Sequence, residues 1–180
     1  MDILCADVVD HWFQYLKTKN TFRGGIYTGG CSTFSRAADY GRRTGALPNG
    51  RKNGDSNLAD SIAAVPGCDK LGPTASINSM LHYRQTEACS GFVTQMKFNS
   101  DLFRSEEGMK LFVNMAKVYF EGGGQQLSIN VVDRETLLAA QKEPEKYAGL
   151  IVRVGGYSDY FCNLSPDLQQ NIIDRSSFEV

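Results

Sequence analysis

The second half of the chain alternates strand and helix patterns, and this alternation constrains the fold more than any other feature. Residues 92–98 place apolar and polar side chains in turn, as a strand does, and residues 127–132 do the same. Between them, Ser105 is a suitable N-cap for a helix that continues through Phe120 with apolar residues along one side. This mixture of elements predicts an α/β or α+β fold.

Apolar spacing and capping residues predict further elements on either side of this region. The helix at the N-terminus has an apolar stripe but no periodic partner in the sequence that follows it. The predicted elements are helices over residues 3–19, from Pro73 through Met80, from Asp133 to before Pro144 and from Ser165 onward, and a buried strand over residues 150–154.

Residues 21–46 are rich in glycine and lack a regular period, a turn is predicted over residues 47–50, and residues 51–55 are polar. A loop of this length inside a compact domain usually serves a function or contacts a partner. It contains two short basic clusters, Arg42-Arg43 and Arg51-Lys52. We interpret them as solvated loop residues, and the alternative is contact with an anionic partner or substrate.

Composition excludes several classes of function. The net charge is −1, which argues against a basic nucleic-acid binder. No apolar run reaches the roughly 18 residues of a transmembrane helix. The first ten residues carry acids rather than the basic start of a signal peptide. We therefore expect a cytoplasmic protein with neither nucleic acid nor membrane as a partner.

The five cysteines have long, irregular spacings that do not suggest a disulfide framework. There is no CxxC pair, and the two histidines do not form an HExxH motif, so we predict no metal site. We expect reduced thiols, with Cys5 and Cys89 as small buried apolar residues. The three glycines 122–124 lack the Lys and Ser/Thr of a phosphate loop, and Gly122 is predicted at the C′ position of a helix end.

The most informative segment is residues 151–161, where a predicted strand leads into Gly155-Gly156 and then into aromatic residues. Taken by itself, it predicts a tight turn in which one glycine adopts a positive φ angle. Gly155 and Gly156 are equivalent in this respect.

Four segments of the chain resemble glycyl radical enzymes, the superfamily of pyruvate formate-lyase. They occur in the family's order and cover nearly the whole chain. They are residues 45–51 (GALPNGR, resembling GAxPxGR), 66–75 (PGCDKLGPTA, resembling PGxDKxGPTA), 126–133 with 137–147 (a strand and an AQxxPExY helix), and 153–157 (RVGGY, resembling RVxGY). The resemblance implies the C-terminal part of a ten-stranded α/β barrel, with residues 1–58 ending the barrel region and 59–180 forming the glycine radical domain.

By this resemblance Gly156 bears the radical, and Gly155 fills the variable position of the motif. A Cα radical is stabilised when the amide nitrogen donates and the carbonyl withdraws electron density, which requires a planar α-carbon. A residue without Cβ avoids clashes in that plane. The resemblance further implies that neighbouring residues position the loop or are recognised by an activating enzyme; for Arg153 and Tyr157, a core or salt-bridge role is an equal alternative. These residues are Arg153, Val154, Gly155, Tyr157 and Ser158.

The resemblance also implies the reaction cycle. An activating enzyme with a [4Fe-4S] cluster uses S-adenosylmethionine to generate a 5′-deoxyadenosyl radical, which removes a hydrogen atom from Gly156. The stored radical passes to a cysteine thiol, and the thiyl radical removes hydrogen from a small organic substrate. This chain itself would bind no cofactor. The reaction class stays open among formate acetyltransferase-like, dehydratase-like and decarboxylase-like chemistry under anaerobic conditions.

The chain departs from the family in length, because family members have several hundred residues and carry the catalytic cysteine on an upstream hairpin. Cys68 and Cys162 lie in family-like segments at positions that do not hold this cysteine, and Cys31 in a glycine-flanked loop is the remaining local candidate. We therefore expect a radical-bearing subunit or fragment that is inactive without a large partner chain carrying the cysteine. The alternatives are a repair module for oxygen-damaged enzymes and a non-catalytic remnant or binding domain.

Overall fold

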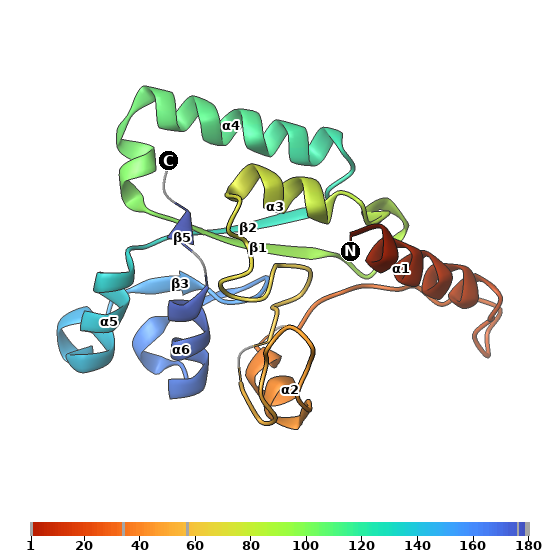
Figure 1. The fold of residues 1–180 in the computed structure, drawn as a ribbon, viewed down its shortest axis with the longest axis horizontal. Helices are drawn as coiled ribbons and strands as arrows, with labels where there is room; N and C mark the ends of the chain where they lie inside the picture. Colours follow the sequence, from red (N-terminus) through yellow and green to blue (C-terminus); the bar gives the residue numbers. More distant parts are fainter. Residues whose placement is uncertain (1, 34, 57, 176, 179–180) are drawn as a thin grey trace.

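The structure is a computed structural model that describes residues 2–33, 35–56, 58–175 and 177–178 (Figure 1). The helices are α1 (Asp2–Lys17), α2 (Ala37–Arg43), α3 (Pro73–Met80), α4 (Glu106–Glu121), α5 (Arg134–Lys142) and α6 (Pro166–Asp174). The strands are β1 (Val93–Phe98), β2 (Gln126–Val131), β3 (Ile151–Arg153), β4 (Ser158–Tyr160) and β5 (Ser177–Phe178). The predicted mixture of helices and strands is confirmed.

Three parallel strands form a sheet in the order β2-β1-β5. The pairing of β1 with β2 runs from Val93 opposite Gln126 to Phe98 opposite Val131, and Phe98 lies opposite Phe178 on β5. All six residues of β1 are buried, as expected for a central parallel strand with both faces covered. Strand β5 was not predicted from the sequence, since it contains two residues.

Helices α3 and α4 cover one face of the sheet (Figure 1). Alternate strand residues point toward them, because successive side chains of a strand face opposite sides. Phe98 has ring contacts with Phe103, Phe112 and Phe178 at centroid distances of 5.7 to 6.3 Å. This apolar cluster also contains Ile77, Met80, Met96, Leu102 and Tyr119, with Leu127 and Ile129 packed against it. We call this side the helix face of the sheet.

The opposite face carries the β3–β4 hairpin together with α5 and α6 (Figure 1). These elements have an apolar cluster of their own, which we call the hairpin core: Val132, Leu137, Ala140, Val152, Val154, Phe161, Leu164, Ile172 and Ile173. The sheet side chains on this face are mostly polar; we call it the hairpin face and define it by Gln95, Lys97, Gln126, Ser128 and Asn130.

The N-terminal part extends away from this body. Helix α1 packs through Phe13, which contacts the ring of Phe92, whereas Leu4 and Val8 are more than 60% exposed. The glycine-rich stretch contains α2, which the sequence pattern did not predict. Its neighbour Arg51 is buried and donates to five backbone carbonyls of residues 41–55, so its interpretation as a solvated loop residue was wrong.

Several details of helix ends and burial differ from expectation. The left-handed glycine after α4 is Gly123 (φ 94°) rather than Gly122. The Asp133 carboxylate accepts hydrogen bonds from Ser100 instead of capping α5. Ile151 is exposed within the strand predicted to be buried, and Cys89 is exposed where a buried thiol was expected. The Ser105 cap is confirmed: its hydroxyl oxygen accepts from the Gly108 N–H at 2.9 Å.

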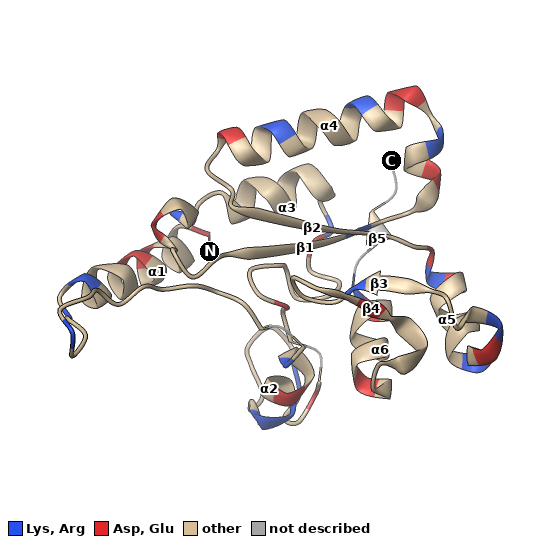
Figure 2. Ribbon diagram, turned by 180° about the vertical axis from the view of Figure 1, so that it is seen from behind, with Lys and Arg blue, Asp and Glu red and all other residues tan. Residues whose placement is uncertain are grey.

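Along α4, acidic and basic residues are interspersed rather than sorted by sign (Figure 2). Within the part of the chain that the structure describes, no helix has the length and apolar character needed to cross a bilayer.

Candidate functional site

The turn between β3 and β4 places Gly156 at the tip of the hairpin. Strand pairing runs from Ile151 opposite Tyr160 to Arg153 opposite Ser158, and the Val154 N–H donates to the Tyr157 carbonyl at 2.8 Å. Gly156 has a φ of 88°, a conformation that L residues rarely adopt. Gly155 is buried and has no positive φ, so the two glycines that the sequence left equivalent differ in the structure.

The side chain of Arg153, at the end of β3, spans the exposed side of the turn. One guanidinium nitrogen, Nη2, donates to the carbonyl oxygen of Gly156 at 2.8 Å, and Nη1 donates to Ser158 Oγ at 3.3 Å. The orientation of the carbonyl group attached to the Gly156 α-carbon is therefore fixed. Gly156 and Tyr157 themselves are exposed, so a partner can reach them.

Strand β2 anchors the hairpin through Asn130. Its side-chain amide accepts from the Arg153 backbone N–H and donates to the Arg153 carbonyl, both at 2.6 Å. Gln126 on the same strand lies near the tip: its Nε2 would be 3.8 Å from a Cβ added to Gly156. Among the described residues, no other heavy atom outside the turn lies within 4 Å of that position. A substituted Gly156 would thus be strained by its φ angle rather than by crowding.

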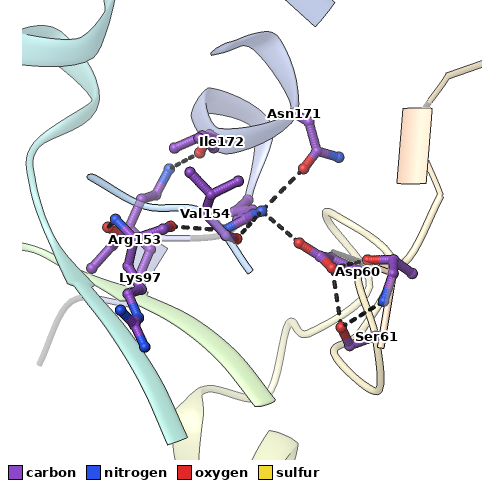
Figure 3. A network of polar contacts seen from close by, with 10 residues as sticks. Asp60, Ser61, Lys97, Arg153, Val154, Asn171 and Ile172 are labelled. Atoms are coloured by element: carbon purple, nitrogen blue, oxygen red, sulfur yellow. Dashed lines mark hydrogen bonds and ion pairs between the residues drawn. The ribbon is translucent and has the colours of Figure 1, made fainter. Parts of the chain in front are cut away.

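Arg175 joins the base of the turn to the distant segment that contains Asp60, and Figure 3 shows its partners Val154, Asn171 and Asp60. Its guanidinium donates to the Val154 carbonyl at 3.1 Å and to the Arg153 carbonyl at 3.5 Å. It also pairs with the Asp60 carboxylate at 2.5 Å, and both side chains are more than nine-tenths buried. Burial lowers the pKa of Arg175, and the charge of Asp60 opposes that shift.

Lys97 connects β1 to the end of α6. Its ammonium donates to the carbonyls of Ile173 at 2.9 Å and Ile172 at 3.4 Å, where the helix dipole favours a cation (Figure 3). Burial is the main cause that lowers the pKa of Lys97 to about 8, and the charges of Arg134 and Arg175 add to it. Sequence patterns missed Asn130, Lys97, Arg175 and Asp60, because polar residues on a strand or loop ordinarily indicate solvent exposure.

The cysteines do not gather at the turn. Cys31 packs with Phe13 and Phe92 on the side of the sheet away from the hairpin, and burial raises the pKa of its thiol. Cys162 packs beside the hairpin core and donates to the Tyr147 carbonyl at 3.4 Å. In the described ranges, no three His, Cys, Asp or Glu side chains come together as metal ligands.

The hairpin with a left-handed glycine at its tip is held on a parallel sheet, which makes this an α/β arrangement, and comparisons with known proteins identify its class. The family model described as "Glycine radical" matches residues 58–162. The probable dehydratase YbiW of Escherichia coli is 38% identical over 98% of this chain and 22% of its own length. The isethionate sulfite-lyase of Nitratidesulfovibrio vulgaris is 39% identical over 82% of this chain and 18% of its own.

Solved structures superpose closely. The glycerol-bound B12-independent glycerol dehydratase of Clostridium butyricum has a TM-score of 0.94 at 35% identity, over 99% of this chain and 23% of that one. The chain therefore belongs to the glycyl radical enzyme superfamily and contains its C-terminal glycine radical domain. It spans about a fifth of the length of the curated relatives that it matches.

Proposed function

We propose that Gly156 stores the radical in this chain and that Arg153, Val154, Gly155, Tyr157 and Ser158 form the loop that an activating enzyme recognises. The observation that carries this proposal is the hydrogen bond from Arg153 to the Gly156 carbonyl. Spin on the Gly156 α-carbon delocalises into that carbonyl only while the two stay coplanar. The N–H that donates a hydrogen bond to this oxygen also stabilises the electron density that the carbonyl group withdraws from the radical centre.

The proposed cycle transfers one hydrogen atom at each step. A 5′-deoxyadenosyl radical from the S-adenosylmethionine and [4Fe-4S] activating enzyme takes hydrogen from Gly156, giving 5′-deoxyadenosine and the glycyl radical. The glycyl radical then takes hydrogen from a cysteine thiol, and the thiyl radical takes hydrogen from the substrate. After rearrangement the product radical recovers hydrogen from that cysteine. The substrate is a small organic molecule, and the reaction is of the lyase or transferase type.

We place the thiyl cysteine on a polypeptide segment outside this sequence, which makes the chain the radical-bearing part of a larger assembly. Cys31 packs on the helix side of the sheet, and no described sulfur lies within 4 Å of a Cβ on Gly156. Helices α1 and α4 expose apolar side chains suited to burial against such a segment: Ile3, Leu4, Val8, Leu111, Val118 and Phe120. The three-stranded parallel sheet would then form part of the ten-stranded barrel.

Anaerobic activation tests the radical site. Incubation with the activating enzyme, S-adenosylmethionine and a reductant should give a doublet electron paramagnetic resonance signal, split by the one remaining α-hydrogen. Gly156→Ala should abolish it, whereas Gly149→Ala is the matched control, since a Cβ there meets no described atom within 4 Å. Air should then cleave the activated chain at Gly156. A doublet that persists in Gly156→Ala would refute the assignment.

The partner is tested by adding a polypeptide that carries the cysteine hairpin to the activated chain. Substrate turnover should require both components. Turnover by this chain alone would contradict the need for a partner.

A further inference from the structure

The residues that fix the glycine turn include one segment far from it in sequence. Asn130 binds the turn from strand β2, and the Arg153 side chain binds it from the hairpin itself. The Val154 carbonyl, in contrast, accepts a hydrogen bond from Arg175. Val154 immediately precedes Gly155-Gly156, so the position of its carbonyl sets the plane of the first peptide group in the turn. Arg175 lies beyond the residues 58–162 that the family model matches.

Arg175 is itself held by Asp60. The Nη2 atom of its guanidinium reaches the Asp60 carboxylate at 2.5 Å and Asn171 Oδ1 at 3.3 Å. A buried guanidinium without a carboxylate partner is strongly disfavoured, because desolvation penalises its charge. The planar fork of arginine allows one side chain to bind the carboxylate and the two carbonyls of Arg153 and Val154 at once.

Asp60 is in turn fixed by its own surroundings (Figure 3). The hydroxyl of Thr33 donates to its Oδ1, as does the hydroxyl of Ser61 at 3.2 Å. The Thr33 N–H donates to Ser61 Oγ at 3.2 Å, which ties the two segments together. Ser61 has a φ of 57°, the one positive φ among the described non-glycine residues. Strained backbone of this kind persists only where its surroundings enforce it, and it is frequent at functional sites.

We infer that Asp60 and Arg175 are positioning residues for the glycine turn: the carboxylate fixed by Thr33 and Ser61 holds the guanidinium, and the guanidinium fixes the carbonyls that precede Gly155-Gly156. Through this pair, the docking of Thr33 against residues 60–61 controls the geometry and the opening of the turn. The consequence for radical storage rests on the proposed function, whereas the consequence for the turn does not.

Hydrogen exchange of the full chain, without activation, tests the positioning directly. Asp60→Asn removes the charge at nearly constant shape, and Arg175→Lys keeps a charge but loses the fork. Both should accelerate exchange of the Arg153 and Val154 amides by about tenfold or more, because exchange follows local opening. The amides of β1 should be unaffected. Asp167→Asn is the matched control, since Asp167 forms an exposed ion pair with Arg42 that does not contact the turn.

Thr33→Val provides a milder variant that keeps the ion pair but removes one donor to Asp60, and it should give a smaller acceleration in the same amides. Unchanged exchange at Arg153 and Val154 in all three variants would overturn the inference. Equal acceleration of amide exchange throughout β1 would also overturn the inference, because it indicates general destabilisation of the fold.

Activated protein supplies a second readout that loss of stability alone would not change. In Asp60→Asn the hyperfine splitting of the glycyl doublet should change, because the peptide planes beside the radical are less well fixed, whereas Asp167→Asn should match the unsubstituted chain. An unaltered hyperfine splitting in Asp60→Asn would contradict the predicted effect of this pair on the radical. Absence of any radical in the unsubstituted chain would refute the proposed function instead, and the exchange result would still decide the positioning role.

Discussion

The two faces of the β2-β1-β5 sheet differ in the kind of contact that joins them to the elements packed against them. The helix face packs Met96 and Phe98 of β1 against α3 and α4 in a continuous apolar cluster. The hairpin face meets the hairpin, α5 and α6 through hydrogen bonds, with Asn130 on the Arg153 backbone and Lys97 on the end of α6. Apolar packing is non-directional, whereas hydrogen bonds specify orientation. The comparison suggests that the helix face stabilises the fold and the hairpin face sets the geometry of the glycine turn.

The largest effect is expected on the helix face. Phe98→Ala removes a ring that is 1% exposed, and should lower the free energy of unfolding by about 3–5 kcal/mol. Urea denaturation measures this loss. Phe22→Ala is the control, because Phe22 is fully exposed and should change stability little. A loss smaller than that caused by Asn130→Ala on the hairpin face would contradict the comparison.

An intermediate effect is expected at Asn130. Asn130→Ala leaves the Arg153 backbone N–H without its side-chain partner and leaves the Arg153 carbonyl with the 3.5 Å contact from Arg175, and should cost about 1–3 kcal/mol in unfolding free energy. It should also increase exchange of the Arg153 amide far more than Phe98→Ala does. Ser128→Ala is the matched control, since the buried Ser128 hydroxyl on the same strand has no partner among the described residues. Equal effects of the two substitutions would contradict the anchoring role of Asn130.

The smallest effect concerns Lys97 and pH. Its pKa is about 8 in the folded chain against an ordinary value of 10.5, so between these values the unfolded chain binds the extra proton. The free energy of unfolding therefore rises with pH in this window, and the burial penalty is fully present below pH 8. From pH 7.5 to 9 the rise should be on the order of 1 kcal/mol at most.

Lys97→Met should remove this rise, which urea denaturation at the two pH values can test. Burial raises the pKa of Cys31, which opposes the trend at the upper end, but Cys31 is present in both proteins and cancels in the difference. The same pH dependence in Lys97→Met and the unsubstituted chain would show that Lys97 is not the group responsible.

Much of the fold could be predicted because its local patterns agree with the final structure. The predicted strand over residues 92–98 is β1 at Val93–Phe98, and the Ser105 cap begins α4. Elements that depend on distant contacts could not be predicted. The two residues of β5 form a strand only because β1 is beside them, and α2 lies in a stretch with no apolar period.

The site was predictable only in part, for a physical reason. A positive φ at one glycine of the pair followed from the turn, but the choice of Gly156 over Gly155 relied on the family resemblance. The roles of Asn130 and Lys97 were hidden, since alternating polar residues on a strand normally face water and here face a second layer. Asp60 and Arg175 are separated by 115 positions, and no local pattern records their pairing.

The hairpin core has a consequence for how the glycine turn is held. Because β3, β4, α5 and α6 enclose an apolar cluster of their own, their attachment to the hairpin face of the sheet depends on a few polar contacts. The place of Gly156 relative to the sheet is therefore set by bonds of defined length and direction rather than by the close fit of apolar side chains.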